Sequence, residues 1–75
     1  MSANSPREDT ASYIRKRTLE LIGLDPGIRD RDIAAQVYGP GSPGMMVQET
    51  CRDLAEEGLT RRKLRPDGLL GTWIT

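Results

Sequence analysis

The stretch that decides the fold is residues 54–68, which read LAEEGLTRRKLRPDG. Gly58 follows a helix-forming segment and is the natural point for that helix to end. The basic segment after it has the character of a strand, and the Pro-Asp-Gly sequence at residues 66–68 is typical of a tight turn. A second strand then closes on TWIT at residues 72–75. The stretch therefore predicts a helix followed by a hairpin whose basic residues gather on the first strand.

The residues before this stretch supply the rest of the predicted helix. Val47, Cys51, Leu54 and Ala55 recur at helical spacing, so one face of the segment is expected to belong to the core. The pair Ser42-Pro43 resembles a helix cap followed by a first-turn proline, and we expect the helix to begin there. A loop rich in glycine and proline, residues 39–44, separates it from the preceding element.

Two further helices are predicted nearer the N-terminus. Ser5-Pro6 indicates the start of the first, and Gly23 is expected to end it. Asp30 is expected to cap a short second helix that runs to Tyr38 and stops at Gly39. The core face of the first helix is expected to consist of Ala11, Ile14, Thr18, Leu21 and Ile22.

Size and composition limit the function. The chain has 75 residues, so we expect a disordered arm at residues 1–4 and one domain at residues 5–75. It contains 11 Lys and Arg, 11 Asp and Glu, no His and one Cys. Without His, and with a single thiol, neither a zinc site nor a His-activated nucleophile can be assembled. We therefore expect no enzyme activity, no metal, no cofactor and no small-molecule substrate.

The sequence also predicts the compartment. A lone cysteine suits a reducing environment, and the N-terminus lacks the apolar core of a signal peptide. No apolar run approaches the ~20 residues that a membrane-spanning helix needs. The expectation is a cytoplasmic protein without a membrane partner.

From about residue 5 to residue 75, the predicted order of helices, turn and strands resembles the winged helix-turn-helix family of DNA-binding domains. The most specific part of the resemblance runs from Val47 through Gly58 to residues 73–75. It implies an α+β fold, namely a three-helix bundle with a C-terminal two-stranded β-hairpin, or wing. It further implies sequence-specific binding of double-stranded DNA by a small transcriptional regulator, with the third helix in the major groove and the basic wing on the backbone.

The resemblance also implies which residues contact DNA. Those on the groove-facing side would be Ser42, Met46, Gln48, Glu49 and Arg52. Those on the wing would be Arg61, Arg62, Lys63 and Arg65. Gln48 and Arg52 would discriminate bases, because amide and guanidinium groups pair in bidentate fashion with adenine and guanine. Four wing charges predict a log affinity that falls against log salt with a slope of order −3 to −4. A homodimer or a larger assembly is the expected form, because one small module binds weakly.

An alternative uses the same fold as a protein-interaction module. The expected outer face of the third helix carries Glu49, Asp53 and Glu56 against Arg52 alone, which opposes phosphate binding. Met45 and Met46 at the start of this helix could form an adaptable apolar patch for a protein partner. The basic hairpin could then be a solvated edge strand whose charges prevent aggregation. Trp73 is expected to pack the hairpin onto the third helix rather than to stack on a base.

Overall fold

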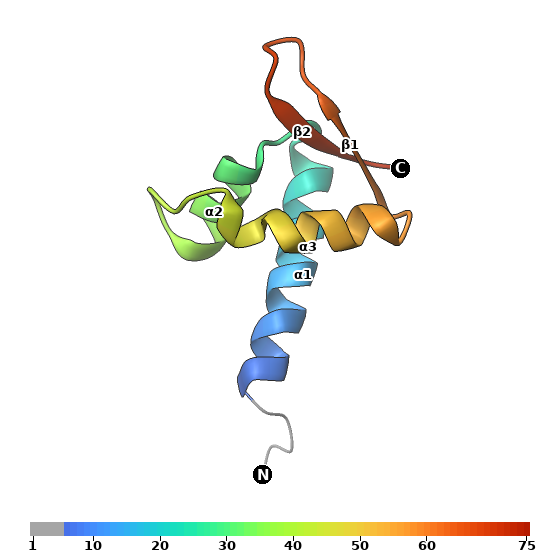
Figure 1. The fold of residues 1–75 in the computed structure, drawn as a ribbon. Coiled ribbons are helices and arrows are strands. Elements are labelled where there is room, and N and C mark those ends of the chain that lie inside the picture. The colour runs from blue at the N-terminus through green and yellow to red at the C-terminus, as the bar shows by residue number, and fades with distance from the viewer. Residues whose placement is uncertain (1–5) are drawn as a thin grey trace.

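The computed structural model describes residues 6–75, with side chains from residue 10 onward. This part of the chain forms three helices followed by a two-stranded antiparallel hairpin, an α+β arrangement with a winged-helix-like layout (Figure 1). The elements are α1 (Pro6–Leu24), α2 (Asp30–Tyr38), α3 (Met45–Glu56), β1 (Thr60–Leu64) and β2 (Leu70–Ile74). The arm expected at residues 1–4 and the expected cap at Ser5 lie outside the described residues. Within residues 6–75, the helices all fall short of the length and apolarity needed to cross a membrane.

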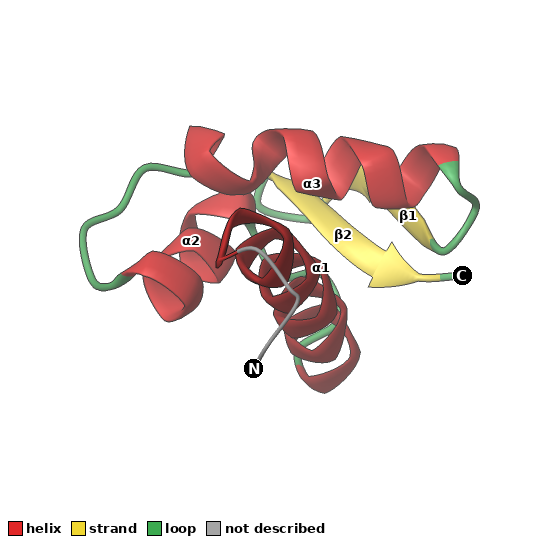
Figure 2. Ribbon diagram, turned by 90° about the horizontal axis from the view of Figure 1, so that it is seen from below, coloured by secondary structure: helices red, strands yellow, loops and turns green. Residues whose placement is uncertain are grey.

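The core lies where the three helices meet the hairpin. In the view of Figure 2, α3 runs alongside the hairpin strands and α1 passes beneath them. The α3 residues Val47, Cys51 and Leu54 are fully buried, as the spacing predicted, whereas Ala55 is half-buried. The buried apolar side chains are Leu21, Ile22, Ile28, Ile33, Ala34, Val47, Cys51 and Leu54. Burial of this small set provides most of the driving force for folding.

The expected core face of α1 is only partly correct. Thr18, Leu21 and Ile22 are buried, but Ile14 is half-buried and Ala11 is exposed. The physical reason is visible in Figure 1, where the N-terminal half of α1 extends beyond the body formed by the other elements. Helical periodicity identifies a face, but it does not show how far along the helix the neighbours reach.

The joint between α3 and the hairpin forms as predicted. Gly58 adopts the left-handed region with φ 81°, which glycine tolerates without steric cost. Its N–H donates to the Ala55 carbonyl at 3.0 Å, and the Leu59 N–H donates to the Leu54 carbonyl at 3.1 Å. This pair of bonds is a Schellman motif and satisfies two carbonyls at the end of α3. The chain then enters β1 directly, and the strands pair from Thr60 with Ile74 to Leu64 with Leu70.

Two predicted helix starts are wrong. Arg29, not Asp30, is the N-cap of α2, and no side chain caps the helix. The Asp30 carboxylate instead binds Arg62 of β1, so a long-range ion pair outcompetes the local cap. The α3 helix begins at Met45, later than the Ser42-Pro43 pair predicted, with Gly44 as its N-cap. No side chain caps α3, and Gly44 packs closely on the start of α2, where an added Cβ would lie only 3.0 Å from the Arg31 backbone nitrogen.

The predicted ends of α1 and α2 agree more closely with the structure than the predicted starts do. Gly39 ends α2 as expected, and its N–H donates to the Ala35 carbonyl at 3.0 Å. The first helix continues one residue beyond the expected stop at Gly23, to Leu24. An Asp25 N–H bond to the Leu21 carbonyl at 2.9 Å then finishes the turn.

A short segment between α1 and α2 extends the hairpin, which the sequence did not reveal. Ile28 forms an isolated antiparallel bridge with Thr72, and the Gly27 N–H donates to the Thr72 carbonyl at 2.8 Å. Trp73 packs here rather than on α3 as predicted, because a Cβ at Gly27 would lie 2.8 Å from its indole ring. The loop between α1 and α2, rather than α3, therefore receives the only tryptophan.

Candidate binding surfaces of the third helix and the hairpin

The outer side of α3 presents most of the residues that the DNA interpretation placed there. Met46, Gln48, Glu49 and Arg52 are all exposed on this helix. Ser42 is not on α3 but in the preceding loop, where it is half-buried and its N–H donates to the Gly39 carbonyl at 3.2 Å. The structure therefore brings four of the five groove-facing candidates together.

The same side of α3 is acidic. Glu49, Asp53 and Glu56 are exposed, and their spacing of four and three residues places them along one line of the helix. Arg52 is the only exposed base among the α3 residues, but Arg15 of α1 interacts with Asp53 and forms an ion pair with Glu57, the residue after α3. The four charged α3 side chains lie within about 11 Å along the axis, close to the ~8 Å screening length at physiological salt. The α3 residues of this face therefore carry a net negative charge, which is unfavourable for contact with a phosphate backbone.

Arg62 does not belong to an exposed strip on the hairpin. Its guanidinium donates to Asp30 Oδ1 at 3.0 Å and to Oδ2 at 2.8 Å, and also to Thr72 Oγ1 at 3.0 Å. The Arg62 and Asp30 side chains are only 15% and 19% exposed. The hydrogen bond with Asp30 raises the pKa of Arg62 above its ordinary value. Arg62 thus fastens β1 to the start of α2.

Cys51 lies beside this ion pair inside the molecule. Burial is the main reason that the pKa of the Cys51 thiol is raised to about 12, and the nearby Asp30 carboxylate raises it further. The thiol is fully buried, as expected for a small apolar core residue. Arg62 therefore lies next to Cys51 of α3 and Asp30 of α2, so the face of β1 that carries Arg62 is turned toward these two helices.

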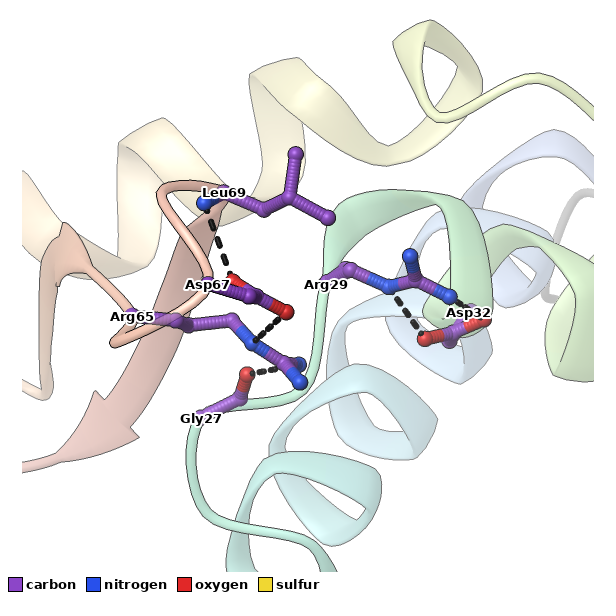
Figure 3. A network of polar contacts seen from close by, with 6 residues as sticks. All are labelled: Gly27, Arg29, Asp32, Arg65, Asp67 and Leu69. Atoms are coloured by element: carbon purple, nitrogen blue, oxygen red, sulfur yellow. Dashed lines mark hydrogen bonds and ion pairs between the residues drawn. The ribbon is translucent and has the colours of Figure 1, made fainter.

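Arg65 holds the hairpin turn against the α1–α2 loop (Figure 3). Its Nη1 donates to the Gly27 carbonyl at 2.9 Å, and its Nε lies 3.3 Å from Asp67 Oδ2. Asp67 Oδ1 in turn accepts a hydrogen bond from the Leu69 N–H at 3.0 Å. Arg65 is therefore engaged inside the molecule, although its side chain remains 31% exposed.

Arg61 and Lys63 are the exposed cations of β1. They face Trp73 and Gly71 in the register, and alternation along the strand puts them on the opposite face from Arg62. The Lys63 ammonium lies 5.1 Å from the centre of the Trp73 ring, within cation–π range. The four basic residues of the hairpin are therefore divided between two faces and do not form one strip with α3.

A surface near the hairpin turn was missed by the sequence reasoning. A pocket of about 260 Å³ lies between the start of α2 and the hairpin and is lined by Arg29, Asp30, Arg31, Leu69 and Leu70. Leu64 pairs with Leu70 across the hairpin and is 69% exposed. We call this set the tip surface, consisting of Arg29, Asp30, Arg31, Leu64, Leu69 and Leu70. The sequence feature that could have indicated this surface is the presence of leucines on both sides of the turn, in KLRPDGLL at residues 63–70.

The start of α3 adjoins the tip surface. An added Cβ on Gly44 would lie 3.2 Å from the Asp30 Cβ, so the residue before α3 touches the start of α2. Met45 and Met46 follow Gly44 directly, and Met45 is 74% exposed. Exposed apolar side chains thus come from two neighbouring elements of the same region.

Comparison of the chain with protein families, with curated protein sequences and with solved structures found no match. In the described part of the chain, no group of three or more His, Cys, Asp or Glu side chains is arranged to hold a metal ion. A function therefore has to be argued from the residues, distances and charges of the two surfaces.

Proposed function

We propose that this chain is a protein-interaction module with a winged-helix-like layout, and that it binds its partner through the tip surface and the adjoining start of α3. The observation that carries the proposal is the apolar pocket region itself. Leu69 and Leu70 line the pocket and are 45% and 43% exposed, and Leu64, which pairs with Leu70 across the hairpin, is 69% exposed. Exposed apolar side chains gathered around a concavity are typical of binding surfaces, whereas single exposed leucines are common anywhere.

Electrostatics support a protein partner over DNA. The outer face of α3 carries three acidic side chains and one arginine, and Arg62 and Arg65 of the hairpin are already occupied inside the molecule. A phosphate backbone needs several free cations on one continuous surface. Methionine and leucine side chains at the tip surface and at the start of α3 instead suit a partner with apolar groups of its own.

A photoreactive side chain placed at Leu70 tests this proposal. The same substitution at Tyr13 on α1 is the control, because Tyr13 is 56% exposed and lies on another element. In cells that make the protein, the Leu70 probe should yield a discrete adduct that protease destroys and nuclease does not. Excess wild-type chain should compete for that adduct, and excess Leu64→Asp chain should not. A nuclease-sensitive adduct, or the same adduct from Tyr13, would overturn the proposal.

Sequence-specific duplex DNA binding is a second candidate, favoured by one observation. Gln48 and Arg52 are exposed on α3, and Arg61 and Lys63 are exposed on β1 without ion pairs to other described side chains. Counting the three free cations Arg52, Arg61 and Lys63 in place of the four wing charges, we expect a salt slope of about −2 to −3. The informative variant is Arg61→Glu, since Arg62→Glu would break the Asp30 ion pair and perturb the fold.

A further inference from the structure

The pocket at the tip surface has the size of a side-chain site rather than of a small-molecule site. Its volume is about 260 Å³, below the ~300–1,000 Å³ that is usual for ligand pockets. Leu69 and Leu70 form one wall, and Arg29 to Arg31 at the start of α2 form the other. An apolar side chain of a partner could therefore pack against the leucines. The residues next to it in the partner chain would then contact the arginines.

The charge around the pocket is positive. Asp30 is paired with Arg62, so its carboxylate is neutralised. Arg29 is paired with Asp32, through a bond from Nε to Oδ2 at 2.8 Å (Figure 3). Arg31 is exposed and has no ion pair with any other side chain of residues 10–75. One uncompensated positive charge therefore lies beside an apolar wall.

The pocket is also held in shape before any partner arrives. Arg65 fixes the turn to the Gly27 carbonyl, and Asp67 fixes the Leu69 backbone next to the pocket. Arg62 fixes β1 to Asp30, which itself lines the pocket. A surface fixed by such bonds loses less conformational freedom on binding, so a short segment can bind it.

We infer that the tip surface recognises an acidic peptide segment, in which one leucine- or phenylalanine-sized side chain enters the pocket and a neighbouring carboxylate pairs with Arg31. This inference rests on the proposed function and names the chemistry of the partner. Nucleic acid fits the site less well, because its phosphates would reach Arg31 but would leave the exposed Leu69 and Leu70 in water. A basic partner also fits less well, because its charges would oppose Arg31 at short range.

The test is an NMR titration of the full ¹⁵N-labelled chain with three synthetic twelve-residue peptides. The first has one central leucine flanked by glutamates, the second replaces that leucine by alanine, and the third replaces the glutamates by lysines. The first peptide should cause saturable shifts at the amides of Arg31, Leu69 and Leu70. The alanine peptide should bind about 10-fold more weakly, since burial of a leucine is worth ~1.5–3 kcal/mol. The lysine peptide should bind about 2- to 5-fold more weakly, since an exposed ion pair is worth roughly 0.2–1 kcal/mol.

A charge reversal provides the matched control. Arg31→Glu should reverse the preference, so that the lysine peptide binds more tightly than the glutamate peptide. Glutamate in the first turn of a helix is favourable, so this variant should fold. Lys16→Glu makes the same change in charge at an exposed position on α1 and should leave the preference unchanged.

Two results would overturn the inference. One is the absence of saturable shifts at the pocket amides, and the other is equal affinity for the acidic and basic peptides. If either occurs while the Leu70 probe still yields a protease-sensitive adduct, the interaction module stands and only the acidic partner is rejected. If the adduct is nuclease-sensitive instead, the proposed function itself fails.

Discussion

Arg62 shows how one residue can mislead an interpretation made from sequence. It lies in a run of basic residues, and that run predicted a phosphate-binding strip. In the folded chain its guanidinium is shared between Asp30 and Thr72 and is mostly buried. Strand alternation alone separates it from Arg61 and Lys63, which face the other way. The function of each arginine therefore depends on its register position, not on the composition of the run.

Arg62→Gln should destabilise the protein by about 2–3 kcal/mol, because it leaves Asp30 charged and unpaired in a mostly buried site. Arg61→Gln, one residue away on the exposed face, should change the stability by no more than about 0.5 kcal/mol. Urea unfolding followed by Trp73 fluorescence measures both. Adding Asp30→Asn to Arg62→Gln should recover part of the loss. Equal effects of the two single variants would show that the ion pair does not fasten the hairpin.

Cys51 should be unreactive in the folded protein. Its pKa is raised from 9.0 to about 12 by burial, so the thiolate fraction at pH 8 should fall about 1,000-fold. The contribution of this shift to stability is fully present below pH 9 and is lost as the pH rises toward 12. Reaction with a disulfide reagent at pH 8 should be at least about 100-fold slower in buffer than in urea. Similar rates in the two solvents would contradict the burial of this thiol.

At the scale of elements, short-range patterns predicted the helices and the hairpin well. Gly58 ends α3 through bonds that involve only residues 54–59, and the backbone bonds that close the hairpin turn involve only residues 65–69. The errors arose where distant residues intervened. The Asp30 carboxylate pairs with Arg62 instead of capping α2. The β-bridge of Ile28 is formed with Thr72, which lies far along the chain. A pattern within ten residues carries no information about such partners.

The hairpin and the α1–α2 loop are joined through two glycines. A Cβ at Gly71 would lie 2.5 Å from the Gly27 carbonyl oxygen and 2.9 Å from the Arg65 Cγ. Gly71→Ala should therefore destabilise the protein by about 3 kcal/mol, the upper end of the cost of overpacking. Gly23→Ala is the matched control, because an added Cβ there would have no atom within 4 Å apart from its chain neighbours and the backbone of its own helix.

The control should stabilise the helix by about 0.5–1 kcal/mol. Thermal unfolding measures both variants, and about 3 kcal/mol corresponds to a fall in Tm of roughly 12–24 °C for a chain of this size. If Gly71→Ala melts at the same temperature as Gly23→Ala, the close approach of β2 to the α1–α2 loop is wrong.

At the scale of the whole molecule, the candidate site was the least predictable part. The sequence placed Met46, Gln48, Glu49 and Arg52 on the outer side of α3, where the structure has them. It could not show the tip surface, because the pocket joins residues 29–31 to residues 69 and 70. It also could not show which cations are free, since ion pairs between distant elements decide that. The net charge of zero is divided so that the α3 face is acidic and the tip surface is positive.

The most direct test of the central claim is an amide map of the ¹⁵N-labelled chain titrated with a random 20-base-pair duplex at about 20 mM salt. The claim is that the tip surface binds protein and that α3 with the hairpin does not bind DNA. The expected result is no saturable shift at Gln48, Arg52 or Lys63, because the α3 face is acidic and the hairpin cations are divided between two faces. Saturable shifts at these three amides, weakening with salt at a slope of about −2 to −3, would contradict it.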